Sequence, residues 1–178
     1  QKIEDFPLIL NENMDRLKGF NITIPYKEEI FQYLDEVDID AENIGAVNTI
    51  KVMEDYRLKG FNTDAYGFEN SLKPLLKGYE KQALILGTGG ASKAIAFVLN
   101  KLNIDYRFVS RTPKNKNTIA YHQLDEEVIK QSHLIVNCTP LGTFPNIEDL
   151  PKIPYEFLTR EHILYDLIYN PAVTSFLR

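Results

Sequence analysis

A short apolar segment that runs into a glycine-rich loop constrains the fold of this chain more than any other feature. Residues 82–87 (QALILG) are almost continuously apolar, which is typical of a strand buried on both faces of a parallel sheet. The loop 87–92 (GTGGAS) follows, and residues 91–102 have helical periodicity. This order predicts a strand–turn–helix unit whose helix N-terminus can bind a pyrophosphate. Ser92 stands where the usual pattern has a third glycine, and a purely structural glycine turn is the alternative.

The rest of the second half alternates strands and helices in the same way. Apolar segments predict three more strands, with a short helix between two of them. This alternation favours a parallel sheet with right-handed crossovers. We therefore expect an α/β fold whose second part, from about Lys81, is a Rossmann-like dinucleotide-binding domain. The predicted elements are strands 105–110, 133–138 and 163–168 and helix 128–131.

The first part of the chain also mixes strands and helices but has no nucleotide-binding signature. Two of its strands are expected to form a hairpin, with Glu54 and Asp55 as a two-residue turn. A helix should follow that hairpin and close the first part of the chain. The predicted elements are strands 18–25, 45–53 and 56–62 and helices 25–35 and 65–76.

The residues after the second strand of the predicted sheet indicate which dinucleotide binds. NAD-specific domains of this class place a carboxylate about 20 residues after the glycine loop, where it binds the ribose 2′-hydroxyl. Residues 110–116 (SRTPKNK) contain no acid but three cations, Arg111, Lys114 and Lys116. A guanidinium binds a 2′-phosphate well, whereas a carboxylate would repel it. The loop therefore favours NADP over NAD, and a solvated basic loop is the alternative.

Composition narrows the class of partner. The chain has 20 Lys+Arg against 25 Asp+Glu, a net charge of −5, which argues against nucleic-acid binding. It has neither an apolar run of about 18 residues nor a signal-peptide pattern, so we expect no membrane association. The single cysteine, Cys138, and three scattered histidines predict a reduced protein without a metal site. We expect a cytoplasmic protein, and the chain begins and ends without tails, as if cut from a longer one.

Two charged residues in the first part are candidates for acid–base chemistry. Lys27 falls in the first turn of the predicted helix 25–35, at the unfavourable end of the helix dipole for a cation. A field that disfavours the charged amine suits acid–base catalysis. Asp64 immediately precedes the predicted helix 65–76, where it would be an N-cap. An ordinary surface lysine and a purely structural cap are the alternatives, and neither residue is decisive alone.

Six short motifs follow one another along the chain: 21–27 (NITIPYK), 45–49 (GAVNT), 60–64 (GFNTD), 87–92 (GTGGAS), 137–142 (NCTPLG) and 165–171 (YDLIYNP). In this order they resemble the motifs of one enzyme family, the shikimate dehydrogenases. The first motif, N-[VI]-T-[VI]-P-x-K, is present as residues 21–27 (NITIPYK). Six motifs in order, extending over about residues 21–174, are far more specific than any one of them. The sequence departs from the family at Ser110, where Asn is usual, and in its later basic residue, which falls at Lys114 or Lys116.

The resemblance implies a role for each matching residue. Lys27 and Asp64 would be the catalytic pair, with Lys27 as the acid–base group. Thr23, Asn48 and Tyr169, together with that pair, would bind the substrate. The glycine loop would hold the pyrophosphate, the basic loop the 2′-phosphate, and two later residues the nicotinamide. The cofactor-binding residues would be Gly87, Thr88, Gly89, Gly90, Ala91, Ser110, Arg111, Thr112, Lys114, Asn115, Thr139 and Leu167.

The resemblance also implies a reaction, the reversible NADPH-dependent reduction of 3-dehydroshikimate to shikimate in aromatic amino-acid and chorismate biosynthesis. Residues 1–78 would form an incomplete substrate-binding domain, and residues 79–178 a Rossmann-like NADP-binding domain. Family members also have an earlier Ser-x-Ser segment and later helices with a substrate-binding Gln, and this sequence contains neither. A small-molecule substrate and a monomer or homodimer are expected.

Three other functions remain open at this stage. A quinate dehydrogenase, or one of broad quinate/shikimate specificity, would use NAD, and Arg111 without a neighbouring acid argues against that cofactor. A methylenetetrahydrofolate dehydrogenase also uses a lysine, but the Asn-Thr-Asp run at 62–64 favours the shikimate type. A catalytically silent NADP-binding module would be favoured by loss of Lys27 or Asp64, and both are present.

Overall fold

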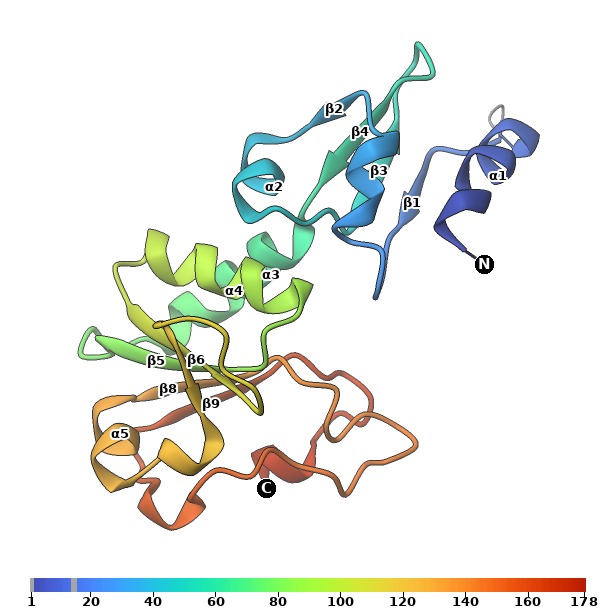
Figure 1. The fold of residues 1–178 in the computed structure, drawn as a ribbon. Coiled ribbons are helices and arrows are strands. Elements are labelled where there is room, and N and C mark those ends of the chain that lie inside the picture. Colours follow the sequence, from blue (N-terminus) through green and yellow to red (C-terminus); the bar gives the residue numbers. More distant parts are fainter. Residues whose placement is uncertain (1, 14–15) are drawn as a thin grey trace. The chain divides into compact units, whose positions relative to one another are not determined.

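The computed structural model describes residues 2–13 and 16–178, and the chain divides into two compact units, Gln1–Glu69 and Asn70–Arg178. Figure 1 follows the elements of both units in chain order. The sequence-based boundary after residue 78 assigns a function to each part, and that assignment stays a prediction.

The first unit is built on a four-stranded sheet. Its elements are α1 (Phe6–Asn13), β1 (Gly19–Asn21), β2 (Glu36–Val37), α2 (Ile39–Ile44), β3 (Thr49–Val52) and β4 (Leu58–Phe61), with 3-10 helices at Ile3–Asp5 and Glu29–Tyr33. The strand order is β1-β3-β4-β2, in which only the β2–β4 pair is parallel. Buried apolar side chains, among them Phe6, Ile30 and Ile50, form the core of this unit. This core holds the strands that flank the candidate residues, because Lys27 follows β1, Asn48 precedes β3 and Asp64 follows β4.

The predicted hairpin is present, but its connection has one more residue than expected. β3 and β4 pair antiparallel along their whole length. Tyr56 N donates to the Met53 carbonyl at 3.0 Å, so Glu54 and Asp55 are the central residues of the turn, as predicted. Tyr56 then has a φ of 67°, in the left-handed region. A turn followed by one left-handed residue is a common three-residue hairpin connection, so the two-residue length was wrong.

The helix predicted over 25–35 was also wrong. Residues 24–28 form turns, and only a 3-10 helix at Glu29–Tyr33 follows them. In an α-helix the Lys27 carbonyl would accept a hydrogen bond from the residue four positions later. Here it accepts from Val47 N at 2.8 Å instead. Because Lys27 lies in a turn before a short 3-10 helix, the argument from the helix dipole does not apply to it.

Helix α3 (Thr63–Leu72) begins two residues before the predicted start, and its cap is Asn62 and not Asp64. Asn62 Oδ1 accepts from Ala65 N at 3.1 Å, which is the N-cap interaction. A 3-10 helix at Lys73–Leu75 continues the segment. The prediction that Asp64 is an N-cap was therefore wrong, and its carboxylate is available for another partner.

The second unit contains a five-stranded parallel sheet. Its elements are β5 (Gln82–Leu86), α4 (Gly90–Lys101), β6 (Asp105–Ser110), β7 (Thr118–Ala120), α5 (Glu126–Gln131), β8 (Leu134–Asn137) and β9 (Ile163–Asp166), with 3-10 helices at Tyr121–Gln123, Tyr155–Phe157 and Ser175–Leu177. The order is β7-β6-β5-β8-β9, and every neighbouring pair is parallel. The predicted α/β class and parallel sheet are confirmed. The edge strand β7 was not predicted, because its three residues lie in a polar stretch without periodicity.

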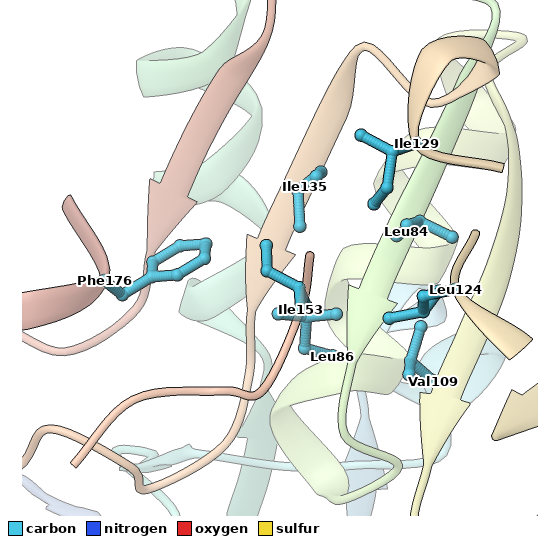
Figure 2. Close-up of a cluster of buried hydrophobic side chains, with 8 residues drawn as sticks. All are labelled: Leu84, Leu86, Val109, Leu124, Ile129, Ile135, Ile153 and Phe176. Carbon is cyan, nitrogen blue, oxygen red and sulfur yellow. The ribbon is translucent and has the colours of Figure 1, made fainter. Parts of the chain in front are cut away.

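The strand that opens this unit is buried on both faces, as its apolar run predicts. Leu84 and Leu86 alternate along β5 and meet the buried cluster that Figure 2 shows. Ala83 and Ile85 point to the opposite face and are also at most 2% exposed. The cluster comprises Leu84, Leu86, Val109, Leu124, Ile129, Ile135, Ile153 and Phe176. A sheet held in this way gives fixed positions to the loops that leave the carboxyl ends of its strands, where ligands of such sheets bind.

Candidate active site

The loop after β5 has a backbone conformation that requires glycine. Gly87 has a φ of 103°, which side chains rarely adopt. Its N–H donates to the Val109 carbonyl at 2.8 Å, so the turn is bonded to the neighbouring strand β6. A Cβ at Gly87 would stand 3.2 Å from the Thr139 methyl group, which shows that the loop after β8 packs against the glycine loop. Two of the four segments predicted to surround the cofactor, those after β5 and β8, therefore lie together.

The N-terminus of α4 fits a pyrophosphate. Its N-cap is Gly89, which offers no side-chain cap, and the space where its Cβ would stand is open. Thr88 and Gly89 are exposed. Ser92, which replaces the third glycine, donates from Oγ to the Gly89 carbonyl at 2.6 Å and is 1% exposed. The serine thus closes the loop on itself, while the first N–H groups of the helix remain available to an anion.

The loop after β6 carries the predicted basic residues on the surface. Arg111, Lys114 and Lys116 are exposed, and none of them forms an ion pair with a residue in the described part of the chain. Thr112 N donates to Ser110 Oγ at 3.3 Å, which folds the start of the loop. Unpaired cations on a loop at the carboxyl end of β6 fit a ribose 2′-phosphate.

Asn115, at the end of the same loop, has a structural task. Its Oδ1 accepts from Thr118 Oγ1 at 2.8 Å and from Asn117 N at 3.1 Å, which turns the chain into β7. Leu167 lies in the loop after β9, and its N–H donates to the Asn137 carbonyl at 3.2 Å. The predicted cofactor residues thus all lie at or just after the carboxyl ends of strands in one sheet.

In the first unit, the structure joins Lys27 and Asp64. Lys27 Nζ donates to Asp64 Oδ2 at 2.5 Å, across 37 positions of sequence. The lysine side chain is 14% exposed and the aspartate side chain 39% exposed. The amine is therefore largely shielded but reachable, and the carboxylate holds it by a charge-assisted hydrogen bond. A positioned amine of this kind can give a proton to, or take one from, a bound oxygen atom.

Asn48 is buried and is hydrogen-bonded to Thr63, the residue before Asp64. No role was predicted for Thr63 from the sequence. Asn48 Oδ1 accepts from Thr63 N at 2.9 Å, and Asn48 Nδ2 donates to Thr63 Oγ1 at 3.0 Å. Because a backbone N–H can only donate, it determines which way the Asn48 amide faces. Thr49 Oγ1 also bonds to Asn48 Oδ1 at 3.0 Å. The position of Thr63 between the cap residue and Asp64 was the available signal.

Thr23 and Tyr169, the two remaining substrate candidates, are exposed. Thr23 lies beyond the end of β1, so the strand predicted over 18–25 was too long. Ile22 N donates to the Asn48 carbonyl at 2.8 Å, which brings the Thr23 segment next to Asn48. Tyr169 belongs to the second unit and is 91% exposed. The structure therefore brings together the substrate candidates of the first unit. Tyr169 belongs to the second unit and is not among them.

Other reactive side chains have structural environments. Burial raises the pKa of the Cys138 thiol, with a smaller contribution from Asp166, so this cysteine stays protonated and unreactive. His162 accepts from Thr159 N at Nδ1, at 3.0 Å. Within residues 2–13 and 16–178 there is no metal-binding group of three or more His, Cys, Asp or Glu. The same residues include no helix long and apolar enough to cross a membrane.

A surface hollow of about 630 Å³ lies elsewhere in the second unit. Tyr121, His122, Leu124 and residues 148–156 line it. None of these is a predicted site residue. The hollow is therefore not part of the candidate site, which consists of the Lys27–Asp64 pair, Asn48 and the loops at the carboxyl edge of the parallel sheet.

Comparison with known proteins gives a consistent result. Residues 2–50 match the family model of the shikimate dehydrogenase substrate binding domain. The chain is 40% identical over 185 residues to a shikimate dehydrogenase (NADP(+)) from Clostridium botulinum, covering 99% of this chain and 70% of the relative. It is 41% identical over 175 residues to one from Methanococcus maripaludis, covering 90% of this chain and 62% of that protein. A shikimate 5-dehydrogenase from Thermus thermophilus, solved in complex with NADP(H) and shikimate, superposes with a TM-score of 0.82 at 35% identity, covering 100% of this chain and 69% of that one.

Proposed function

Because the chain belongs to the shikimate dehydrogenase family, we propose that it catalyses the reversible, NADP-dependent reduction of 3-dehydroshikimate to shikimate. The observation that carries this proposal is the Lys27–Asp64 pair, a shielded amine held at 2.5 Å by a carboxylate. The glycine loop, the open N-terminus of α4 and the basic loop after β6 support NADP as the cofactor.

When bound, NADPH supplies the hydride that reduces the ring ketone. Lys27 then acts as the acid, because its Nζ gives a proton to the ketone oxygen as negative charge develops there. In the reverse direction, neutral Lys27 removes the proton from the hydroxyl that becomes the ketone. One hydride and one proton enter the substrate in reduction and leave it in oxidation, so the step is balanced.

Asp64 orients the amine in this scheme. Its carboxylate fixes Lys27 Nζ through Oδ2, and Oδ1 is left for a substrate hydroxyl beside the reacting carbon. Since Asp64 lies in the first turn of α3, its position depends on the helix that Asn62 caps. A fixed amine avoids part of the entropy cost of bringing acid and substrate together.

The remaining substrate contacts follow from the family. Asn48 Nδ2 makes one hydrogen bond among the described residues, to Thr63, so its second N–H can donate to a ring hydroxyl. Thr23 and Tyr169 are exposed hydroxyl residues that can contact the ring and its substituents. In this scheme residues 1–78 bind the substrate and residues 79–178 bind NADP. A cytoplasmic location and a monomeric or homodimeric state remain predictions from the sequence.

The test is the oxidation of NADPH, followed by its absorbance, with 3-dehydroshikimate as substrate. Lys27→Ala should lower the turnover number by about 10²–10⁴-fold, because positioned acid–base catalysis is lost. NADPH affinity should be nearly unchanged, since the glycine loop belongs to the other unit. Lys51→Ala, which removes an exposed lysine from β3, is the matched control and should behave as wild type. Turnover within about threefold of wild type in Lys27→Ala would exclude Lys27 as the acid.

The reverse reaction, oxidation of the hydroxy acid with NADP or NAD, separates the alternatives. Oxidation of quinate with NAD at rates similar to those of shikimate with NADP would assign the broader quinate/shikimate specificity. Tight NADPH binding without turnover of either acid would assign a silent binding module.

A further inference from the structure

We propose that Asn137 and Asp166 are positioning residues for the nicotinamide end of the bound cofactor. They are the last residues of the neighbouring parallel strands β8 and β9, and they stand opposite each other in register. The family resemblance assigns neither of them a role. The inference rests on the proposed function, because it gives these side chains a task in binding NADP.

The Asn137 amide is fully buried and uses all of its hydrogen-bonding capacity. Its Oδ1 accepts from Thr139 N at 3.0 Å and from Thr139 Oγ1 at 2.7 Å. Its Nδ2 donates to Asp166 Oδ1 at 3.1 Å and to the Leu141 carbonyl at 3.4 Å. An amide has two acceptor lone pairs and two N–H groups, so none is left over. The orientation is determined as well, because Thr139 N can only donate and an ionised Asp166 carboxylate can only accept.

The Asp166 carboxylate is held on both of its oxygens. Oδ1 also accepts from Ile168 N at 3.0 Å, and Oδ2 accepts from Thr174 Oγ1 at 2.6 Å. Thr174 is 1% exposed, so this last bond is shielded from water. Three donors, one of them Asn137, offset the cost of partly burying the Asp166 carboxylate. They also fix its position.

The bonds of this network hold loops and not the core of the sheet. From Asn137 they reach residues 139–141, after β8, and from Asp166 they reach Ile168 and Thr174, after β9. Thr139 in turn packs against Gly87, so the network also borders the glycine loop. Thr139 bonds to Asn137 directly, and Leu167 lies between Asp166 and its partner Ile168, so one hydrogen-bonded pair positions both residues that the proposed function places at the nicotinamide.

The basic loop that would bind the 2′-phosphate is held differently. Asn115 Oδ1 and Thr118 Oγ1 fix it locally, at 2.8 Å, where it turns into β7. β7 and β6 lie on the side of β5 opposite to β8 and β9. A change in the Asn137–Asp166 pair should therefore affect the nicotinamide end of the cofactor and leave the adenosine end in place.

Asn137→Asp tests this division. The substitution keeps the side-chain shape but places a second carboxylate oxygen where Nδ2 lies 3.1 Å from Asp166. NADPH binding is followed by nicotinamide fluorescence, and binding of adenosine 2′,5′-bisphosphate, which lacks nicotinamide, by calorimetry. We expect the Kd of NADPH to rise about tenfold or more, and that of adenosine 2′,5′-bisphosphate to change by less than about twofold.

Reversing the two partners should restore part of the binding. Adding Asp166→Asn to Asn137→Asp removes the repulsion between two carboxylates and restores the bond between the partners, but it loses the bonds to Ile168 N and the Leu141 carbonyl, so NADPH affinity should recover only in part. Asn146→Asp, the same exchange at an exposed loop position, should leave both ligands unaffected. Equal losses for the two ligands, or no loss for NADPH, would overturn the proposal, because a merely structural role affects both ends of the site alike.

A second pair of variants decides the matter if Asn137→Asp does not fold. Thr174→Val removes the hydroxyl donor to Asp166 at nearly constant volume, and Thr174→Ser keeps it. Weaker NADPH binding in the first variant but not in the second supports the network, and equal binding in both contradicts it. Turnover of 3-dehydroshikimate by wild type is measured separately. A chain that shows the binding pattern without turnover contradicts only the substrate assignment, whereas a wild type that binds no NADPH overturns both proposals.

Discussion

Among single residues, we expect Arg111 to have the most direct influence on cofactor choice, because its charge is exposed and has no ionic partner in the described part of the chain. A guanidinium contact to a 2′-phosphate is worth about 1.5–3 kcal/mol. Arg111→Asp removes it, adds repulsion and offers a carboxylate to a 2′-hydroxyl. We expect NADP affinity to fall by about 10²-fold or more, while NAD affinity holds or rises. KM values for both cofactors measure the change.

A charge-matched control separates this local effect from a change in net charge. Arg160→Asp alters the charge equally but lies in the turn before β9, at the amino edge of the sheet and away from the basic loop. It should leave the NADP/NAD preference unchanged. The wild-type preference should weaken with added salt, since the loop is exposed. Lys114 and Lys116 can still attract the 2′-phosphate, so an incomplete loss of NADP affinity in Arg111→Asp is consistent with the prediction. An unchanged NADP/NAD ratio would show that the loop is only solvated surface.

Between elements, Glu80 stabilises the connection from α3 to β5. It is 3% exposed, and its carboxylate accepts from Lys77 N at 3.0 Å and Gly78 N at 2.9 Å. Burial alone would raise the pKa of Glu80. The backbone N–H donors together lower it by more than burial raises it, so the net pKa is below its usual value. Because the folded state then holds the proton less tightly than the unfolded state, the stabilisation is present above the unfolded pKa. It is lost as the pH falls through the folded pKa.

Glu80→Gln should therefore lower the free energy of unfolding at neutral pH by about 1–2 kcal/mol, since two charge-assisted bonds become neutral or are lost. The difference from wild type should shrink at about pH 3, because this pH lies below the unfolded pKa of a glutamate and the wild-type protein is then losing the stabilisation. Urea unfolding at the two pH values measures both. Glu148→Gln, at an exposed loop position, is the control. A constant difference at both pH values would show that the charge of Glu80 does not contribute.

The elements also show what could be predicted from the sequence. β5, α4 and β6 were predicted to within a residue or so, because a strand buried on both faces and the amphipathic helix after it have strong, local patterns. The helix over 25–35 failed because its decisive contact is not local. The Lys27 carbonyl accepts a hydrogen bond from Val47 N, twenty positions away. The local hydrophobic pattern of residues 25–35 contains no information about such a contact.

The candidate site follows the same rule. The resemblance pointed to Lys27, Asn48 and Asp64, and the structure joins Lys27 to Asp64 and gives Asn48 a fixed orientation. Thr63 was missed because its contribution is a backbone N–H and a hydroxyl turned toward Asn48, and this depends on where α3 begins. Shifting the predicted helix start by two residues changes which residue caps it and which is left for catalysis.

At the scale of the whole molecule, the proposed tasks are divided between the two units. The acid–base pair belongs to Gln1–Glu69, and the glycine loop and basic loop belong to Asn70–Arg178. Helix α3 begins at Thr63 in the first unit, carries Asp64 in its first turn and ends at Leu72 in the second unit. A ligand that binds only the cofactor residues should therefore stabilise the second unit directly, whatever happens at Lys27.

This division leads to a prediction for thermal unfolding. NADPH at a hundred times its Kd stabilises the folded state by about 2.7 kcal/mol, which for a chain of this length raises Tm by about 5–10 °C. In Arg111→Asp, a hundredfold weaker Kd brings the same concentration to about one Kd, where the stabilisation is only about 0.4 kcal/mol and the shift about 1 °C. Lys27→Ala should keep the full shift, because it removes no cofactor contact. Scanning calorimetry of the three proteins at one NADPH concentration measures this, and amide exchange should show the protection at residues 87–92 and 110–116. A shift that disappears in Lys27→Ala but persists in Arg111→Asp would contradict the assignment of the cofactor to the second unit.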